Sequence, residues 1–343
     1  MKPLSDSTTS PSVALAPLVG PEALISPSRH RLRPPALLLA LGLLLAAAGP
    51  ALAAEDTVDL KPQWKVGQRM VQQYKTTQKQ KIGMPNAAAP MQQATEQTQE
   101  VAVSVVKQRP EGGHELSVEF LTMKIESKMG ETVMLKYDSK TDKTATGENP
   151  MSGIFQKLVG AKFTLLTTPE GEVEKVEGLE KVLESLAAGL PEMFAGMVQS
   201  MVNSDAVKQM SGLPPNLPKE PVAVGHEWPV KTEVALGPLG TMVLDLRYKY
   251  TGLERKRDYS CAVLDHKGFI TSKAGSGTGP VSFSGVSGTT SGRSWYVPSV
   301  GTIIDSFADQ KMKLKMKAMG QDVSMDMDQR VLTKMTEVTT PAE

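Results

Sequence analysis

The sequence predicts a mainly β fold of the α+β type: a curved antiparallel sheet or open half-barrel with a helical segment packed on its concave side. Runs of alternating apolar and polar residues recur along most of the chain, as expected for strands with one buried face. Turns rich in Gly, Pro and Asn separate these runs. One stretch in the middle, residues 179–210, instead has its apolar residues at helical spacing.

The strands before this stretch differ in character. Residues 68–81 predict a polar strand at the edge of the sheet, and residues 82–95 predict a loop. In residues 116–120 the apolar side chains are even-numbered, whereas in residues 121–125 they are odd-numbered. A change of phase inside one strand indicates a β-bulge, which bends a sheet.

The helical stretch carries a stripe of leucine and methionine along one side. Pro191 is expected to start or kink a second helix. The proline-rich residues 212–218 end the helical region as a stiff linker. The stripe consists of Leu179, Val182, Leu183, Leu186, Leu190, Met193, Met197 and Met201.

The second half of the chain is again strand-rich and ends in a β-hairpin. With Gly320-Gln321 as a two-residue loop, Lys315 faces Asp326 and Met316 faces Met325. Charged residues then pair on one face and apolar residues on the other, which favours this register. Before the hairpin, strands separated by Gly, Ser and Thr turns are expected at 242–250, 259–265, 268–274, 280–287 and 292–297.

An export signal precedes the part expected to fold. Basic residues at 29–33 are followed by thirteen largely apolar residues at 36–48 and an A-x-A motif that ends at Ala53. The protein is therefore expected to be exported, periplasmic or secreted, with the signal cleaved after Ala53 and no stable membrane span afterwards. An uncleaved anchor is the alternative, although the apolar run is shorter than the ~20 residues that cross a bilayer. Residues 1–28 are either an extended n-region or a stretch upstream of the true translation start.

The chain is expected to divide into residues 1–53, an N-terminal extension and signal peptide, and residues 54–343, a single β-rich domain. Two halves, 54–178 and 219–343, are suggested around the helical segment 179–211, because a Val-Gly pair lies near a Trp ahead of a strand in each. Without the signal region the chain loses four basic and two acidic residues from totals of 38 and 37, so its net charge is −1. A nearly neutral protein is not attracted to nucleic acid, and no nucleic-acid partner is expected.

Residues typical of catalytic and metal sites are few. Cys261 is the only cysteine, so it forms no intramolecular disulfide, and its strand-like surroundings predict a buried side chain. The histidines His114, His226 and His266 lack the spacing of metal ligands. We therefore expect no catalytic residues, no metal site and no cofactor, and the protein is not expected to be an enzyme.

Methionine offers the main compositional indication of function. The chain contains 19 methionines, whose flexible thioether side chains suit adaptable apolar binding surfaces. The predicted function is an exported, non-catalytic envelope protein that binds an apolar ligand, such as a lipid or acyl chain, between sheet and helices. The residues predicted to contact this ligand are Leu186, Leu190, Met193, Met197 and Met201.

Two other functions stay open. The first is a structural or protein-interaction module, in which the same stripe packs on the sheet as solid core and the partner is another envelope protein. The second is an enzyme. A cavity beneath the stripe distinguishes the ligand carrier from the module.

Four short motifs give a family resemblance. They are Trp64-x-Val-Gly67, Tyr137-Asp-Ser139, Phe163 to Gly171, and Val222-x-x-Gly225-x-x-Trp228. Together they resemble an uncharacterised family of exported bacterial proteins, known only as a domain of unknown function. In architecture, many strands around a central helical segment are similar to the lipid- and lipoprotein-carrier half-barrels of the periplasm, the LolA/LppX type. The resemblance implies no site residues, because the motifs are structural in character.

Overall fold

The computed structural model describes residues 57–85, 89–142, 150–188, 216–235, 240–273, 281–318 and 321–341, which lie within one compact unit, Ala54–Glu343. Over these ranges the chain forms twelve strands and two helices. In chain order they are β1 (Arg69–Gly83), β2 (Met91–Gln108), β3 (His114–Met129), β4 (Thr132–Asp138), α1 (Pro150–Leu158), β5 (Lys162–Thr167), β6 (Val173–Glu177), α2 (Leu179–Ala187), β7 (Glu227–Ala235), β8 (Thr241–Lys256), β9 (Tyr259–Ser272), β10 (Val281–Val297), β11 (Thr302–Ala318) and β12 (Gln321–Thr339).

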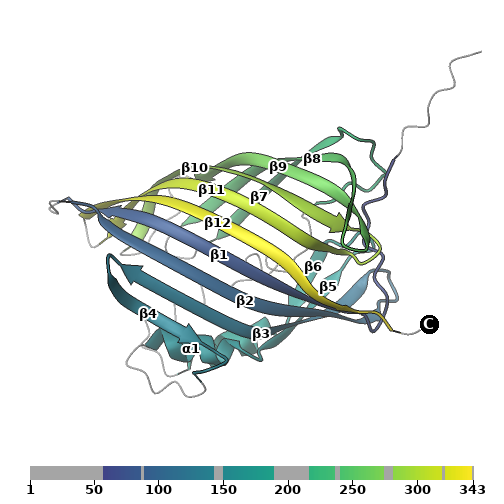
Figure 1. The fold of residues 1–343 in the computed structure, drawn as a ribbon, viewed down its shortest axis with the longest axis horizontal. Helices are drawn as coiled ribbons and strands as arrows, with labels where there is room; N and C mark the ends of the chain where they lie inside the picture. Colours follow the sequence, from purple (N-terminus) through teal and green to yellow (C-terminus); the bar gives the residue numbers. More distant parts are fainter. Residues whose placement is uncertain are drawn as a thin grey trace, which may run out of the picture. The chain divides into compact units, whose positions relative to one another are not determined.

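All twelve strands belong to one antiparallel sheet. Its order is β6-β5-β3-β2-β1-β12-β11-β10-β9-β8-β7, and β4 pairs with β3 beside this path. Figure 1 shows β1 and β12, from opposite ends of the described chain, side by side in the middle of the sheet. The predicted mainly β, antiparallel fold is therefore confirmed.

β1 is a central strand, so the expectation of an edge strand at 68–81 is wrong. It pairs with β2 on one side and with β12 on the other along most of its length. Lys79 and Lys81 lie opposite Asp328 and Asp326 of β12. These aspartates lie some 250 residues later in the sequence. The composition of β1 alone therefore does not show that its lysines have partners of opposite charge on a neighbouring strand.

β3 contains the predicted bulge. Phe120 pairs with Val101 of β2, and Thr122 pairs with the preceding residue, Glu100, so Leu121 is the extra residue. The buried side chains before and after the bulge stay on one face of the sheet, because the extra residue offsets the change in parity.

The four strands expected between 259 and 297 are two long strands, β9 and β10. Gly288 lies inside β10, where a turn was expected, and Gly292, which was expected to start a separate strand, lies inside β10 as well. At Gly288 an added Cβ would lie 2.6 Å from the carbonyl oxygen of Lys311 on β11, and at Gly292 it would meet the carbonyl oxygen of Phe307. Glycine here allows two strands to approach closely, and the turn prediction was wrong for that reason.

The terminal hairpin pairs β11 with β12 two residues away from the predicted register. Asp326 lies opposite Lys313 instead of the lysine two residues later, so the prediction was wrong. Every side chain keeps its predicted face, because strand faces repeat every two residues. The predicted register would oppose Lys311 and Arg330, whereas the observed one brings Asp309 to 3.5 Å from Arg330. An attractive pair thus replaces a repulsive one.

The sheet has two faces, which alternate along each strand. We call the side with the buried clusters the core face and the other side the solvent face. On β12, for example, Thr333 and Met335 are buried on the core face, while Lys334 and Thr336 are exposed on the solvent face.

Buried polar contacts join the starts of β1 and β11 beside a large cluster of buried apolar side chains that includes Trp64. Nε1 of Trp64 donates a hydrogen bond to the carbonyl oxygen of Gly301 at 3.1 Å. Gln72 is 1% exposed, and its Nε2 donates to Oγ1 of Thr302 at 2.9 Å and to the carbonyl oxygen of Ile303 at 2.8 Å. We call this region the closed end of the sheet.

The two helices pack against each other and against β4 and β5. Val182 and Leu186 of α2 form a small buried cluster with Ile154 of α1. Of the helical stretch expected at 179–210, α2 accounts for the first part. Residues 189–210 lie outside the described residues, so the placement of the whole stretch on a concave face stays a prediction.

Candidate functional site

The core face is uncharged over most of the sheet. None of its side chains is Asp, Glu, Lys or Arg along the described parts of eight strands, and His266 is the one titratable base among them. The charged residues of the same stretches all have the opposite parity and project to the solvent face. The stretches are 72–82 of β1, 91–99 of β2, 228–234 of β7, 242–250 of β8, 262–270 of β9, 286–294 of β10, 306–316 of β11 and 323–335 of β12.

An apolar cluster, which we call the methionine patch, lies on the core face of β8 to β12. Three of its methionines, Met242, Met325 and Met327, are only partly buried. The two described helices make their main contacts with β4 and β5, in the other half of the sheet order. The methionine patch therefore has flexible side chains that are still partly exposed. Its members are Met242, Ile270, Val286, Met312, Leu314, Met325 and Met327.

A network of uncharged polar side chains, the glutamine network, continues the core face across β1, β2 and β3. Gln80 lies opposite Met327, at the border with the methionine patch. Nε2 of Gln80 donates to Oε1 of Gln93, and Nε2 of Gln93 donates to Oγ of Ser127 at 2.9 Å. Nε2 of Gln78 donates to Oε1 of Gln80 at 3.0 Å. The glutamines are partly buried, so this part of the core face is neither a dry core nor an open surface.

A row of rings crosses β7, β8 and β9 on the core face. The ring centroids of His226 and Trp228 are 6.1 Å apart, those of Trp228 and Tyr248 5.6 Å, and those of Tyr248 and His266 5.3 Å. Burial raises the pKa of Tyr248 to about 12 and lowers the pKa of His266. Nε1 of Trp228 and Nδ1 of His266 are buried and make no hydrogen bond with any described residue. The row thus adds two hydrogen-bonding atoms to an uncharged face.

Of the five residues predicted to contact a ligand, the structure describes Leu186. Its side chain is 1% exposed and packs on Ile154 and Val182 between the helices, which is a core position. The methionine patch and the glutamine network were not predicted from the sequence as one surface, although the charged residues of these strands all alternate onto the opposite face. The other four predicted residues, Leu190, Met193, Met197 and Met201, lie outside the described residues.

The single cysteine is remote from the histidine nearest to it in sequence. Cys261 and His266 differ in parity and therefore project to opposite faces of β9. Cys261 is fully buried, its Sγ lies 3.6 Å from the carbonyl oxygen of Tyr259, and burial raises the pKa of its thiol. Across the described part of the chain, no group of three His, Cys, Asp or Glu residues is placed to hold a metal ion.

Solved structures show distant likenesses. Lipovitellin, from a study of lipid–protein interactions, is 8% identical with a TM-score of 0.44, and the match covers 81% of this chain but only 26% of the lipovitellin chain. A Bacteroides fragilis protein described as exported, with a YmcC-like fold, is 7% identical with a TM-score of 0.25, covering 82% of this chain and all of the other. OpdL of Pseudomonas aeruginosa is 9% identical with a TM-score of 0.23, covering 78% and 99% of the two chains. None of these likenesses indicates a function.

The family of the chain follows from its sequence rather than from these structural likenesses. No curated protein is significantly similar to the chain. Among the described helices, none has the length and apolar character needed to span a membrane. Residues 111–293 match the model of a family of unknown function, DUF6263, and this match covers more than half of the chain. The chain therefore belongs to the DUF6263 family, in agreement with the family of unknown function that its short motifs predicted.

Proposed function

We propose that this protein is an exported, non-catalytic carrier that holds an apolar ligand, such as a lipid acyl chain, on the core face of its sheet. One observation carries the proposal: the core face is uncharged, and it passes from the methionine patch into the glutamine network. A dry core is built mainly from apolar side chains, whereas this part of the core face keeps partly buried amides that hydrogen-bond to one another. A face that meets solvent on its own tolerates charge.

The methionine patch suits the apolar part of such a ligand. Burial of one methylene group contributes about 0.8 kcal/mol, so a ten-carbon chain gains on the order of 8 kcal/mol before the entropic cost of binding. Methionine adjusts its rotamers to chains of different length and unsaturation. The proposed site is therefore selective for apolar character rather than for one molecule.

The absence of catalysis and the export are parts of the same proposal. A nucleophile needs a base within hydrogen-bond reach, and Cys261 and His266 project to opposite faces of β9. The basic residues, apolar run and A-x-A motif before Ala54 support export with cleavage after Ala53.

Native mass spectrometry of the purified full chain, followed by displacement of a fluorescent fatty acid, tests the proposal. The variant Met327→Lys introduces a charge into the methionine patch and should weaken binding of the fluorescent fatty acid by about tenfold or more, since an unpaired charge against an acyl chain is strongly unfavourable. The matched control is Met84→Lys, because Met84 is 45% exposed just after β1.

Binding of the fluorescent fatty acid that is lost in Met327→Lys and kept in Met84→Lys supports a carrier. A wild-type chain that carries no lipid and does not bind the fluorescent fatty acid would instead favour the structural or interaction module. Equal losses in the two variants would place any binding outside the methionine patch.

A further inference from the structure

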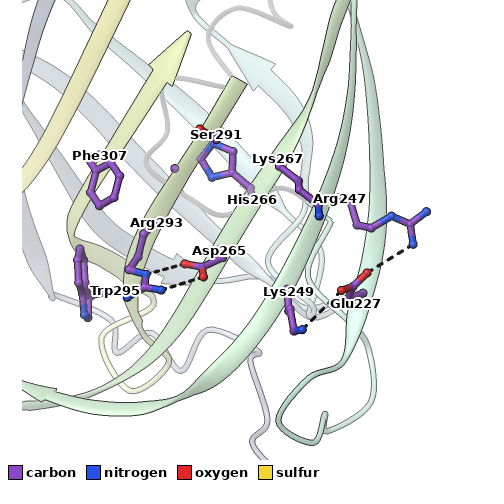
Figure 2. A pocket seen from close by; sticks show the side chains of 11 residues that line it. Glu227, Arg247, Lys249, Asp265, His266, Lys267, Ser291, Arg293, Trp295 and Phe307 are labelled. Carbon is purple, nitrogen blue, oxygen red and sulfur yellow. Dashed lines mark hydrogen bonds and ion pairs between the residues drawn. The ribbon is translucent and has the colours of Figure 1, made fainter. Parts of the chain in front are cut away.

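The solvent face has a cavity of its own, opposite the core face. It has a volume of about 520 Å³ and lies over β7 to β11. Figure 2 shows the charged side chains that line it, which come from neighbouring strands. They are Glu227, Arg247, Lys249, Asp265, Lys267 and Arg293.

One row of these side chains is internally balanced. Glu227, Lys249, Asp265 and Arg293 lie opposite one another in register on β7, β8, β9 and β10, so their charges alternate. Arg293 donates two hydrogen bonds to the carboxylate of Asp265, at 2.6 and 2.9 Å. This pair is bidentate, so the negative charge of Asp265 is balanced by Arg293.

The next row is not balanced. Arg247 and Lys267 lie directly opposite each other, and their outer neighbours in the row are Pro229 and Ser291 instead of carboxylates. Like charges at opposite positions destabilise an antiparallel pair. Arg247 forms an ion pair with Glu227 at 3.7 Å, and Glu227 forms a second ion pair with Lys249 at 3.8 Å. Within the described residues Lys267 makes no ion pair.

The cavity therefore carries surplus positive charge. Four basic and two acidic side chains line it, and with the lining residue His266 counted as neutral this leaves a charge of +2. Two further carboxylates on this face have basic partners: Asp245 lies opposite Lys231 of β7, and Asp309, which is opposite Ser291, lies 3.5 Å from Arg330. Arg247 and Lys267 repel each other across β8 and β9, and an anion held between them would offset that repulsion.

We propose that this cavity binds a phosphate group, with Arg247, Lys267 and the hydroxyl of Ser291 as its donors. A phosphate dianion matches the surplus charge. Guanidinium, ammonium and hydroxyl groups are the usual donors to its oxygens. The phosphate belongs either to a soluble phosphorylated molecule or to a lipid headgroup. The site lies on the opposite face from the methionine patch, so the phosphate site and the apolar-ligand site are tested independently.

Calorimetric titration of the full chain with inorganic phosphate at low ionic strength tests the site, with sodium chloride of equal ionic strength as the reference. Saturable one-to-one binding is expected. Lys267→Gln should weaken it about tenfold or more through loss of one charge-assisted hydrogen bond. Lys267→Arg should retain it. Because Lys267→Gln also removes a like-charge contact, its Tm should not fall below that of the wild type.

The matched control is Lys75→Gln, since Lys75 is an exposed lysine on the solvent face of β1, away from the cavity. Absence of phosphate binding in the wild type, or an equal loss in Lys75→Gln, overturns the proposal. Phosphatidylcholine vesicles with and without phosphatidic acid identify the source. Phosphate-competed binding that requires phosphatidic acid supports a headgroup site. Phosphate binding without vesicle binding supports a site for a soluble phosphorylated molecule.

Discussion

Gln72 joins the start of β1 to the start of β11, and its replacement by methionine should be strongly destabilising. Its Nε2 donates to Oγ1 of Thr302 and to the carbonyl oxygen of Ile303, and its Oε1 accepts from the hydroxyl of Tyr74 at 2.7 Å. Gln72→Met keeps the shape of the side chain and removes all three bonds. At about 1 kcal/mol for each bond, with an added cost for buried partners that lose one, the free energy of unfolding should fall by about 3–5 kcal/mol.

The matched control is Gln78→Met, which lies on the same strand and face. Gln78 is partly buried and donates one hydrogen bond, to Gln80, so the expected loss is at most about 1 kcal/mol. Urea unfolding followed by tryptophan fluorescence measures both variants, with an unchanged m-value as the sign that the unfolded state is the same. Equal losses in Gln72→Met and Gln78→Met would refute the idea that buried glutamine bonds hold the closed end.

Three further outcomes are expected. Gly301→Ala should lower the free energy of unfolding by about 2–4 kcal/mol in the same assay, because Gly301 has φ +69° and a Cβ would collide with the indole nitrogen of Trp64; an unchanged urea midpoint would contradict this. Burial lowers the pKa of His266, so the unfolded chain binds the proton more tightly. The folded protein should therefore lose stability as the pH falls from 6.5, the ordinary pKa of histidine, towards the lower pKa of His266 in the folded state. Urea midpoints measured across this pH range should show a smaller loss for His266→Gln than for the wild type. A double-mutant cycle with Asp309→Asn and Arg330→Gln should give an attractive coupling of about 0.2–1 kcal/mol; zero coupling would count against the observed hairpin register.

The local pattern was sufficient to predict how strands present their side chains. The parity change at residues 120–121 located the bulge in β3, because an extra residue is the way a strand keeps one face buried through such a change. The alternation along β11 and β12 assigned each lysine, aspartate and methionine to its correct face. Side-chain direction is a property of two or three consecutive residues, which is why short windows reveal it.

Relations between strands were not predicted, because they depend on partners far away in sequence. The register of β11 and β12 was wrong by two residues, since the contact of Asp309 with Arg330 was not weighed against the choice of loop. Gly288 suggested a turn in the middle of β10, yet it serves the close approach of β11. The cavity on the solvent face combines Arg247 of β8 with Lys267 of β9, and only the strand order places these two together.

In this sequence the positions of the charged residues, odd or even along a strand, identify the core face better than the hydrophobic residues do. Along β1 the core-face positions from 72 to 82 are glutamine, tyrosine, threonine and isoleucine, so a hydrophobic pattern is nearly absent, and the strand resembles an exposed edge. The charged residues of β1 nevertheless all lie on the other face, as they do over residues 306–316 of β11 and 323–335 of β12. Charged side chains are excluded from this face, whereas hydrogen-bonded amides are kept, because a paired amide costs far less to bury than an ion. The ligand that we propose would match both features, with its apolar chain on the methionine patch and its polar end at the glutamine network.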